Sequence, residues 1–524
     1  MSYYSIIYLF GILPFSLILY GISPKKYRHL VLLFMSYIFF FYISRKLIIC
    51  LIISTLITYF SGLVISKIET EKKSALDGKE KEEKKLIRNK YNKKKKRILI
   101  LSLILLVGSL ALFKYIPFFE VTLNFIFNKN FSFIHLLAPV GISYYTLEAI
   151  SYIVDVYNSK FEAEKSLTKV ALYLSFFPQL IEGPIARFSD TIRELTKNES
   201  LKYQNIILGL ERILFGLIKK FVIVDRLGAP VSEIFKNYQL YDSGITLLGA
   251  IMFTLMLYAD FSGTMDIVIG SAEMFSIKIP ENFRQPFFSK SIQEFWRRWH
   301  ITLGAWLRDY VFYPLSLSKW NQSMGNFLEK YMGKVLARKI PMYISMLIMW
   351  LIAGAWHGGL YTIIISSGVL QFTYILLEEI LSKPADKIYT KMKIKDTFGL
   401  KLFQMIRTGL LFSLAMIFFK STSVHQGFTM FTNVFTKFSL KGLFNGTVLN
   451  LGIDLQDYII LVVFVIVILV VGLIKERGVN LREELNKKSW YIRYPILYIG
   501  IASIIVFGAY GLGYDHVDPI YADF

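Results

Sequence analysis

Long apolar runs recur from one end of this sequence to the other, and they limit the folds open to the chain. A helix needs about 20 apolar residues to cross the roughly 30 Å of hydrocarbon in a bilayer. Within hydrocarbon, only helices and closed barrels satisfy their own backbone hydrogen bonds. The sequence therefore predicts an all-α, polytopic membrane bundle of about ten or more transmembrane helices. The runs behind this prediction are 5–20, 47–65, 98–112, 361–377, 402–419, 458–474 and 492–510.

The basic residues of the chain are concentrated between the apolar runs. The formal net charge is +22, and an excess of this kind can indicate nucleic-acid binding. Here it lies in short connections at 25–29, 67–97 and 475–488, and the positive-inside rule places such loops in the cytoplasm. We therefore expect 67–97 to be a lysine-rich cytoplasmic loop that meets anionic membrane lipids, and we expect no nucleic-acid partner.

Counting crossings outward from these basic loops gives a topology for the chain. The first apolar run lacks a basic leader and a small-residue cleavage site, so we expect a retained helix there. Both termini then lie outside the cytoplasm, with 511–524 as an extracytoplasmic tail. Because no repeat, phosphate-binding loop or heptad array marks off a second domain, we expect 1–524 to form one membrane domain.

Cysteine and histidine residues are too few and too scattered to indicate a metal site. Cys50 is the only cysteine, which excludes an intrachain disulfide and a cysteine-based metal site. The six histidines show no HExxH or comparable ligand spacing, and His300 and His357 alone do not make a zinc site. We expect no bound metal and no bound cofactor.

The stretch EFWRRWH at 294–300 places two tryptophans, two arginines and a histidine in seven residues. On one continuous helix, Trp296 and Trp299 fall on an aromatic face, and His300 falls between that face and the flank of Arg297. One interpretation is an interfacial helix with a tryptophan belt and snorkelling arginines. The other is that the aromatic face packs into the protein while Arg297 and His300 line a polar cavity. Periodicity does not separate the two.

A second stretch, MWLIAGAWHGGLY at 349–361, holds His357 in an uncharged apolar run. This histidine is either a structural hydrogen-bonding group or a functional one, because ionisable groups at membrane depth are functional candidates by default. Burial disfavours imidazolium, so His357 is expected to be neutral and able to act as a general base. The glycines beside it would let a substrate or another backbone approach closely.

The third candidate is the tail, GLGYDHVDPIYADF at 511–524. A terminus of this kind is often frayed, but this one is short, aromatic and acidic. Tyr521 offers a phenol hydroxyl, which is a poor nucleophile unless a base such as histidine takes its proton.

These three stretches and three others together form a recognisable pattern. It resembles the membrane-bound O-acyltransferase family, with the nearest likeness to a bacterial branch of alginate and peptidoglycan O-acetyltransferase membrane subunits. The resemblance covers most of the chain, is densest at 139–359, and implies a helical bundle with interfacial and re-entrant helices around a central funnel and tunnel. The other three stretches are PVGISYYTLEAISYIVDVY at 139–157, FFPQLIEGPIARF at 176–188 and YADFSGTMDIVIGSAEMFSIKIPENFRQPF at 258–287.

The resemblance also implies roles for the candidate residues. His357 of WHG matches the catalytic histidine of the family, and His300 of FWRRWH matches a second functional residue. Members of this branch end in an aromatic tail whose tyrosine carries the acyl group transiently, and Tyr521 and Phe524 match that tail while Pro519 departs from it. The positions expected to contact the substrate are Trp296, Arg297, Trp299 and Trp356.

A mechanism follows from the resemblance as an expectation. An acyl thioester, of coenzyme A or of a cytoplasmic carrier protein, delivers an acetyl or other acyl group to the cytoplasmic side. His357 acts as the base on Tyr521, and Arg297, Trp299 or His300 orients the donor or stabilises the oxyanion. An extracytoplasmic acyltransferase or esterase-like partner then moves the acyl group to a polysaccharide hydroxyl. The expected location is a bacterial cytoplasmic membrane.

Three other interpretations remain open from the sequence. The polymer hydroxyl could enter the protein and take the acyl group directly, with Tyr521 only structural. The acceptor could be a lipid or sterol, which would require a lateral opening to the bilayer. The protein could also be a polysaccharide transporter or scaffold without chemistry, and it would then keep its function after His357→Ala.

Overall fold

The computed structural model describes residues 2–358, 360–510, 514 and 517–518. Across these residues the chain forms helices and no strand, apart from one isolated antiparallel bridge between Phe283 and Trp299. The prediction of an all-α architecture is confirmed. The chain divides into two compact units, Met1–Leu210 with Val268–Pro280, and Glu211–Ile267 with Glu281–Asp523. Helices α9 (Tyr203–Ile218) and α11 (Ser243–Met274) pass from one unit to the other.

Eight helical stretches of the described chain are long and apolar enough to cross a membrane. A shorter apolar stretch, Ile7–Ile22, accompanies them. This agrees with the predicted polytopic bundle, and the stretches contain most of the predicted apolar runs. The eight stretches are Lys25–Leu76, Lys81–Phe127, Ser243–Met274, Lys319–Trp356, Tyr361–Lys391, Phe398–Lys420, Leu455–Glu476 and Trp490–Phe507.

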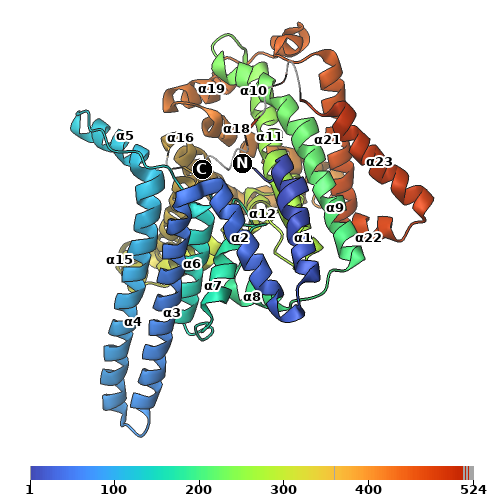
Figure 1. Cartoon of the computed structure of the whole chain (residues 1–524). Helices are drawn as coiled ribbons and strands as arrows, with labels where there is room; N and C mark the ends of the chain where they lie inside the picture. Colours follow the sequence, from blue (N-terminus) through green and yellow to red (C-terminus); the bar gives the residue numbers. More distant parts are fainter. Residues whose placement is uncertain (1, 359, 511–513, 515–516, 519–524) are drawn as a thin grey trace. The chain divides into compact units, whose positions relative to one another are not determined.

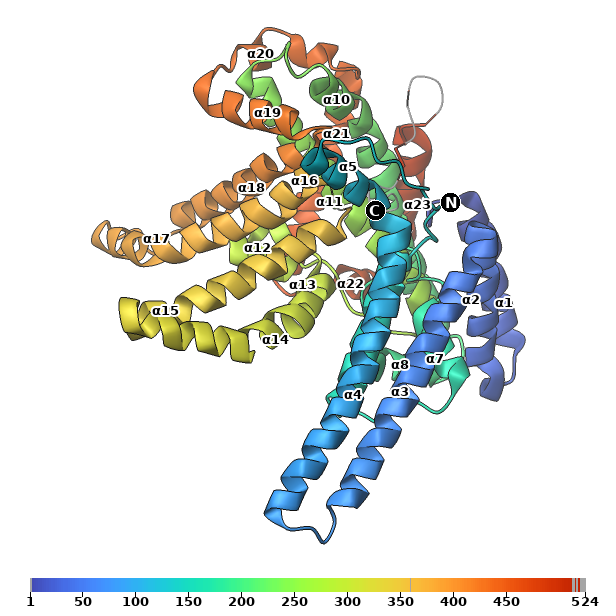
Figure 2. The ribbon, with the colours of Figure 1, turned by 90° about the vertical axis from the view of Figure 1, so that its left-hand side faces the viewer.

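The first unit contains a long antiparallel helix pair, α3 and α4, whose two helices lie side by side in both views (Figures 1 and 2). Its helices are η1 (Ile7–Ile12), α1 (Leu13–Ile22), η2 (Lys25–Tyr27), α2 (Arg28–Ser44), η3 (Arg45–Leu47), α3 (Ile48–Leu76), α4 (Lys81–Leu110), η4 (Ala111–Tyr115), α5 (Ile116–Phe127), α6 (Ile142–Tyr157), α7 (Leu167–Ser175) and α8 (Phe188–Thr196).

The lysine-rich segment 67–97 forms the far end of this helix pair rather than a loop. Helix α3 continues to Leu76 and α4 begins at Lys81, so only a short turn separates them. Lysine and glutamate are good helix formers, and Glu69 of α3 lies 2.5 Å from the Nζ of Lys95 on α4. The lysines and glutamates of 67–97, which predict a loop from the sequence, therefore also stabilise the extended ends of α3 and α4.

The second unit contains the two histidine stretches. Its helices, beyond its parts of α9 and α11, are η5 (Lys219–Val224), α10 (Asp225–Lys236), η6 (Pro286–Phe288), α12 (Ile292–Arg298), α13 (Ile301–Leu307), η7 (Arg308–Phe312), α14 (Tyr313–Ser316), α15 (Lys319–Trp356), α16 (Tyr361–Ile364), η8 (Ile365–Leu370), α17 (Gln371–Lys391), α18 (Phe398–Lys420), α19 (Val424–Thr436), α20 (Lys441–Phe444), η9 (Thr447–Asn450), α21 (Leu455–Glu476), α22 (Leu481–Asn486) and α23 (Trp490–Phe507).

Helix α15 carries WHG at its end and is bent at Gly333 (Figure 2). Gly333 adopts φ 72° and ψ 162°, a conformation open to glycine because it has no Cβ. The Nδ2 of Asn321 on the first arm donates hydrogen bonds of 2.8 Å to the carbonyl of Pro341 and to the Oγ of Ser345 on the second arm. These contacts fix the angle between the two arms.

Buried charges in α11 are paired with basic residues of α9 and η5. Asp266 accepts hydrogen bonds from Arg212 Nε at 3.1 Å and from Lys219 Nζ at 2.7 Å. Because an unpaired buried charge is strongly unfavourable, these pairs let α11 remain one helix of 32 residues despite its acidic side chains.

Candidate active site

The EFWRRWH stretch is broken into two helices, so the prediction of one continuous helix is wrong. Helix α12 ends at Arg298 and α13 begins at Ile301. Between them Trp299 is extended, and His300 has φ 47° and ψ 51°. The cause is pairing with the preceding segment, because Arg284 N donates to Arg298 O at 2.9 Å and Ile301 N donates to Asn282 O at 3.0 Å.

The tryptophans of this stretch pack inside the second unit. Trp299 is buried and stacks on Phe295, with ring centroids 5.5 Å apart. Trp296 is half-buried, and its Nε1 donates a hydrogen bond of 3.0 Å to the Oε1 of Gln371. Protein groups surround Trp299, so the interpretation as a tryptophan belt at a membrane interface is wrong for this side chain.

Arg297 does not accompany His300, contrary to the interpretation that both line one polar cavity. The Arg297 side chain is exposed, whereas His300 is buried. The break in the helix separates them, because the left-handed conformation of His300 turns the chain after α12. The neighbouring Arg298 instead makes ion pairs, with Glu294 at 2.7 Å and with Glu476 at 2.8 Å.

His300 is held in one orientation by a buried asparagine. Only 1% of His300 is exposed, and its ring meets Phe261 edge to face with centroids 4.8 Å apart. The Nδ1 of His300 lies 3.4 Å from the Oδ1 of Asn282, which also accepts from Thr302 N at 3.1 Å and from Thr302 Oγ1 at 2.7 Å.

These contacts determine the tautomer of His300. The backbone N–H of Thr302 can only donate, so the Asn282 atom that it meets is the carbonyl oxygen. That oxygen can only accept, so His300 Nδ1 must carry the proton of this hydrogen bond. In neutral His300, Nε2 therefore carries the lone pair.

His357 lies at the end of α15, directly after Trp356. Two glycines bring this helix close to η8, because a Cβ on Gly354 would lie 2.9 Å from the Ile364 Cα and one on Gly368 would lie 3.1 Å from the Trp350 carbonyl oxygen. Gly354 thus serves backbone packing. Gly358 has φ 144° and turns the chain away after the histidine.

The two histidines lie next to each other in the second unit. Their ring centroids are 6.2 Å apart, and only 4% of His357 is exposed. Trp356 contacts both imidazoles, at centroid distances of 6.0 Å from His300 and 5.0 Å from His357. The structure therefore brings His300 together with Trp356 and His357, which lie more than 50 residues later in the sequence.

Burial and the neighbouring imidazole favour the neutral form of His300. His300 lies in the connection between α12 and α13, outside the candidate membrane spans. Burial lowers the pKa of His300 well below its ordinary value, and the nearby His357 lowers it further. A buried neutral imidazole can accept a proton from a weakly acidic hydroxyl, so the pair is suited to general-base chemistry.

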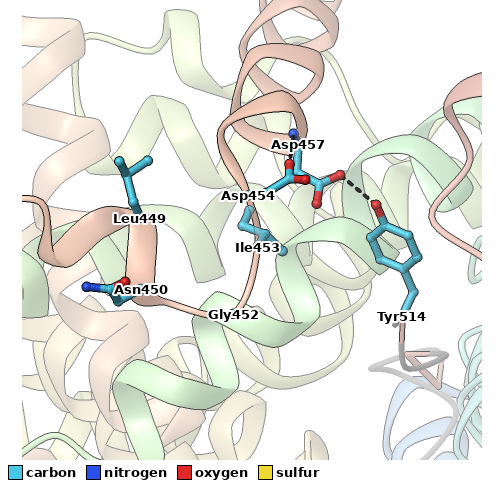
Figure 3. A pocket seen from close by; sticks show the side chains of 7 residues that line it. All are labelled: Leu449, Asn450, Gly452, Ile453, Asp454, Asp457 and Tyr514. Carbon is cyan, nitrogen blue, oxygen red and sulfur yellow. Dashed lines mark hydrogen bonds between the residues drawn. The ribbon is translucent and has the colours of Figure 1, made fainter. Parts of the chain in front are cut away.

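The tail is described only at its beginning. Tyr521, Phe524 and Pro519 lie outside the described residues, so their predicted roles stay predictions. Tyr514 is described and donates a hydrogen bond of 2.7 Å to the Oδ1 of Asp457 (Figure 3). Among the described residues, no three His, Cys, Asp or Glu side chains gather in a way that could hold a metal ion.

Comparisons with known proteins agree with this arrangement. The family model for MBOAT, the membrane-bound O-acyltransferase family, matches residues 163–328. A Pseudomonas aeruginosa protein named "Probable alginate O-acetylase AlgI" is 31% identical over 473 residues, which cover 88% of this chain and 81% of that protein. This chain belongs to the membrane-bound O-acyltransferase family.

Other relatives place this acyltransferase in a bacterial O-acetyltransferase branch of the family. A protein of the same name from Azotobacter vinelandii is 34% identical, with 73% of this chain and 69% of that protein covered. The "Peptidoglycan O-acetyltransferase" of Helicobacter pylori is 31% identical, with 63% of this chain and 62% of that protein covered. The protein is therefore a multi-pass membrane acyltransferase, and the interpretation as a transporter without chemistry is wrong.

Asn282 is the residue of this acyltransferase site that the sequence alone does not single out. It lies in the quoted stretch 258–287, but an asparagine before an aromatic residue gives no signal of its own. Its side chain is fully buried and contacts His300 in the helix break and Thr302 at the beginning of α13. Asn282 is thus a positioning residue for His300.

We predict that Asn282→Asp shifts the acid limb of the pH–rate profile to higher pH. In the wild type burial and the nearby His357 hold the pKa of His300 well below its ordinary value, so the acid limb should lie well below that ordinary value. A carboxylate 3.4 Å from Nδ1 would favour imidazolium, so the Nε2 lone pair of His300 should be lost at a higher pH, with the midpoint of the acid limb raised by about 1 unit or more. The measurement is kcat/KM against pH in proteoliposomes.

The exposed Asn445 provides the matched control, because Asn445→Asp makes the same chemical change at a side chain that bonds Thr447 rather than a histidine. A midpoint that stays at the wild-type value in Asn282→Asp, in folded protein, would contradict the role assigned to His300.

Proposed function

We propose that this protein takes an acyl group, in the first instance acetyl, from a cytoplasmic thioester and loads it onto Tyr521 for O-acylation of a polysaccharide of the cell envelope or a secreted polysaccharide. The observation that carries this proposal is the pair of buried imidazoles, with centroids 6.2 Å apart. The names of the relatives, an alginate O-acetylase and a peptidoglycan O-acetyltransferase, support acetyl as the group and a polysaccharide as the acceptor.

The first half of the reaction forms an ester on the tail. His357 takes the proton of the Tyr521 hydroxyl while the phenolic oxygen attacks the thioester carbonyl carbon. The C–O bond forms, the C–S bond breaks, and the thiolate leaves with the proton returned by the imidazolium. The products are a tyrosyl ester and a free thiol.

The second half transfers the acyl group outward. A nucleophile on the polymer, or on a partner acyltransferase or esterase-like protein, attacks the phenyl ester, and the phenol of Tyr521 is restored. A phenolate is a much better leaving group than a sugar alkoxide because phenol has a pKa near 10. The tyrosyl ester is therefore reactive enough to be a transient carrier.

His300 acts beside His357 as a hydrogen-bond acceptor rather than as an oxyanion donor. With Nδ1–H directed at Asn282, the neutral ring presents its Nε2 lone pair. A lone pair can accept a proton or orient a neighbouring N–H or O–H group, but it cannot stabilise a negative oxygen. From the sequence alone, His300 could either orient the donor or stabilise the oxyanion. This proposal keeps only a role as hydrogen-bond acceptor.

The donor and the location complete the proposal. Coenzyme A thioesters and phosphopantetheine carrier proteins both bring phosphate, which the lysine-rich end of the α3–α4 pair would attract. In this proposal the protein lies in the cytoplasmic membrane of a bacterium, with that end in the cytoplasm and the tail outside. The partner is expected on the outer face.

The test is the mass of the tail peptide from wild-type protein isolated in its native membrane. An acetyl-sized or other acyl addition on Tyr521, lost on mild alkaline hydrolysis, is expected for a phenyl ester. An unmodified Tyr521 during active polymer acylation would overturn the carrier step and favour direct transfer to the polymer.

A further inference from the structure

The beginning of the tail is held by buried charged residues of η5 and α10. Lys220 donates a hydrogen bond from Nζ to the carbonyl oxygen of Val517. Val517 N donates to the Oδ1 of Asp225 at 3.4 Å. The backbone N–H and the backbone carbonyl of Val517 are therefore both hydrogen-bonded. These contacts fix the path of the backbone and do not depend on the side chain at this position.

Lys220 has an unusual setting for an ammonium group. Its side chain is fully buried, and Nζ lies 3.1 Å from Asp225 and 3.8 Å from Asp260. A lysine ammonium has three protons to donate, and the Val517 carbonyl takes one of them. Because a buried cation needs its hydrogen-bond partners, the docked tail helps to complete the site.

A second contact holds the tail three residues earlier. The Tyr514 hydroxyl donates a hydrogen bond to Asp457 Oδ1 (Figure 3). The same oxygen also accepts from Arg226 Nε at 2.9 Å. Arg226 Nη2 donates to the Phe507 carbonyl at 2.9 Å, at the end of α23. Arg226 and Asp457 thus connect the C-terminal end of α23 to Tyr514 of the tail by hydrogen bonds.

We propose that Lys220, Asp225, Arg226 and Asp457 form a tail clamp that positions Tyr521 for acylation. This inference rests on the proposed function. The four clamp residues are positioning residues, because they act on the tail backbone and on Tyr514 and not on the reacting atoms.

The length of the free tether gives the expected size of the effect. Tyr521 follows Val517 by four residues and Phe507 by fourteen. Four extended residues reach at most about 14 Å, so the clamp confines the hydroxyl to a small volume. Effective concentration falls roughly as the −3/2 power of tether length, so releasing the clamp should slow Tyr521 acylation by roughly 6-fold.

Gly228 on α10 offers a way to release Val517 from the clamp without touching any charge. A Cβ at Gly228 would lie 2.5 Å from the Val517 Cγ2, which is too close for two carbon atoms. Alanine is the better helix former, so Gly228→Ala should not unfold α10. Val517→Ala removes the opposing methyl group, so the double variant should restore the fit.

The experiment is a cycle of Gly228→Ala, Val517→Ala and the double variant in the full-length protein, with two readouts. The first is the rate of chymotrypsin cleavage after Tyr514, followed by mass, which reports docking of the tail. The second is the rate of acyl addition to Tyr521 when a thioester donor is supplied. Gly409→Ala is the matched control, because a Cβ there meets nothing within 4 Å.

We expect Gly228→Ala to accelerate the cleavage several-fold and to slow acylation by about 2-fold, because the Tyr514 contact still anchors the tail seven residues before Tyr521. The double variant should restore both rates to the wild-type values. Cleavage that stays at the wild-type rate in Gly228→Ala would overturn the clamp. Faster cleavage with unchanged acylation, or no rescue by Val517→Ala, would overturn the positioning role. If wild-type Tyr521 is never acylated, the proposed function fails, and the cleavage readout still shows whether the tail docks.

Discussion

Replacing His357 with alanine is expected to abolish acyl transfer while leaving the membrane bundle folded. General-base catalysis contributes about 10²- to 10⁴-fold, and His357 is the buried imidazole that the proposed mechanism uses as base. We therefore expect kcat to fall by at least about 100-fold in His357→Ala and in His357→Gln, with thiol release from a thioester as the measurement. His357→Gln keeps much of the side-chain volume, so it separates loss of the base from loss of packing.

The matched control is His425→Ala, because His425 is exposed at the beginning of α19. It should keep wild-type kcat. A cycle with His300→Ala adds a second criterion, because groups that act as a unit give strongly non-additive losses. The double variant should be little worse than His357→Ala alone. Retention of more than a tenth of the wild-type rate in both His357 variants would contradict the role as base.

The apolar runs predict the membrane bundle well because hydrocarbon leaves the backbone few alternatives. The apolar runs do not predict α11 as one long helix. Asp260 and Asp266 interrupt its apolar pattern, and they are tolerated because the basic residues Lys220 and Lys219 lie against them, 3.8 and 2.7 Å away. These partners are about 40 residues away in the sequence, so a local pattern carries no information about them.

The helix break in EFWRRWH shows the same limit at the site. Helical periodicity treats the stretch as one surface, but the segment around Asn282 and Phe283 pairs with it and ends α12 at Arg298. That pairing turns His300 inward and leaves Arg297 exposed. The residue types at the site were thus predictable, whereas their directions depend on a contact that periodicity does not encode.

Removing one oxygen from the tail, in Tyr521→Phe, is expected to stop polymer acylation. The contacts at Tyr514 and Val517 do not involve the Tyr521 side chain, so the tail should dock as in the wild type. Without the phenol only water remains to take the acyl group, so polymer acylation should fall by about 100-fold or more. The measurement is acetate released from purified polymer, with Tyr498→Phe on the exposed face of α23 as control.

Thiol release from the donor in the same variant separates the two possible orders of transfer. If Tyr521 accepts the acyl group first, thiol release also stops in Tyr521→Phe, even when excess polymer is present. If the polymer hydroxyl attacks the thioester directly, thiol release and polymer acylation both continue, and they still depend on His357. In that second case the two imidazoles keep their role as base while the acyl-carrier role of the tail is lost, because the same buried pair can activate a sugar hydroxyl as well as a phenol.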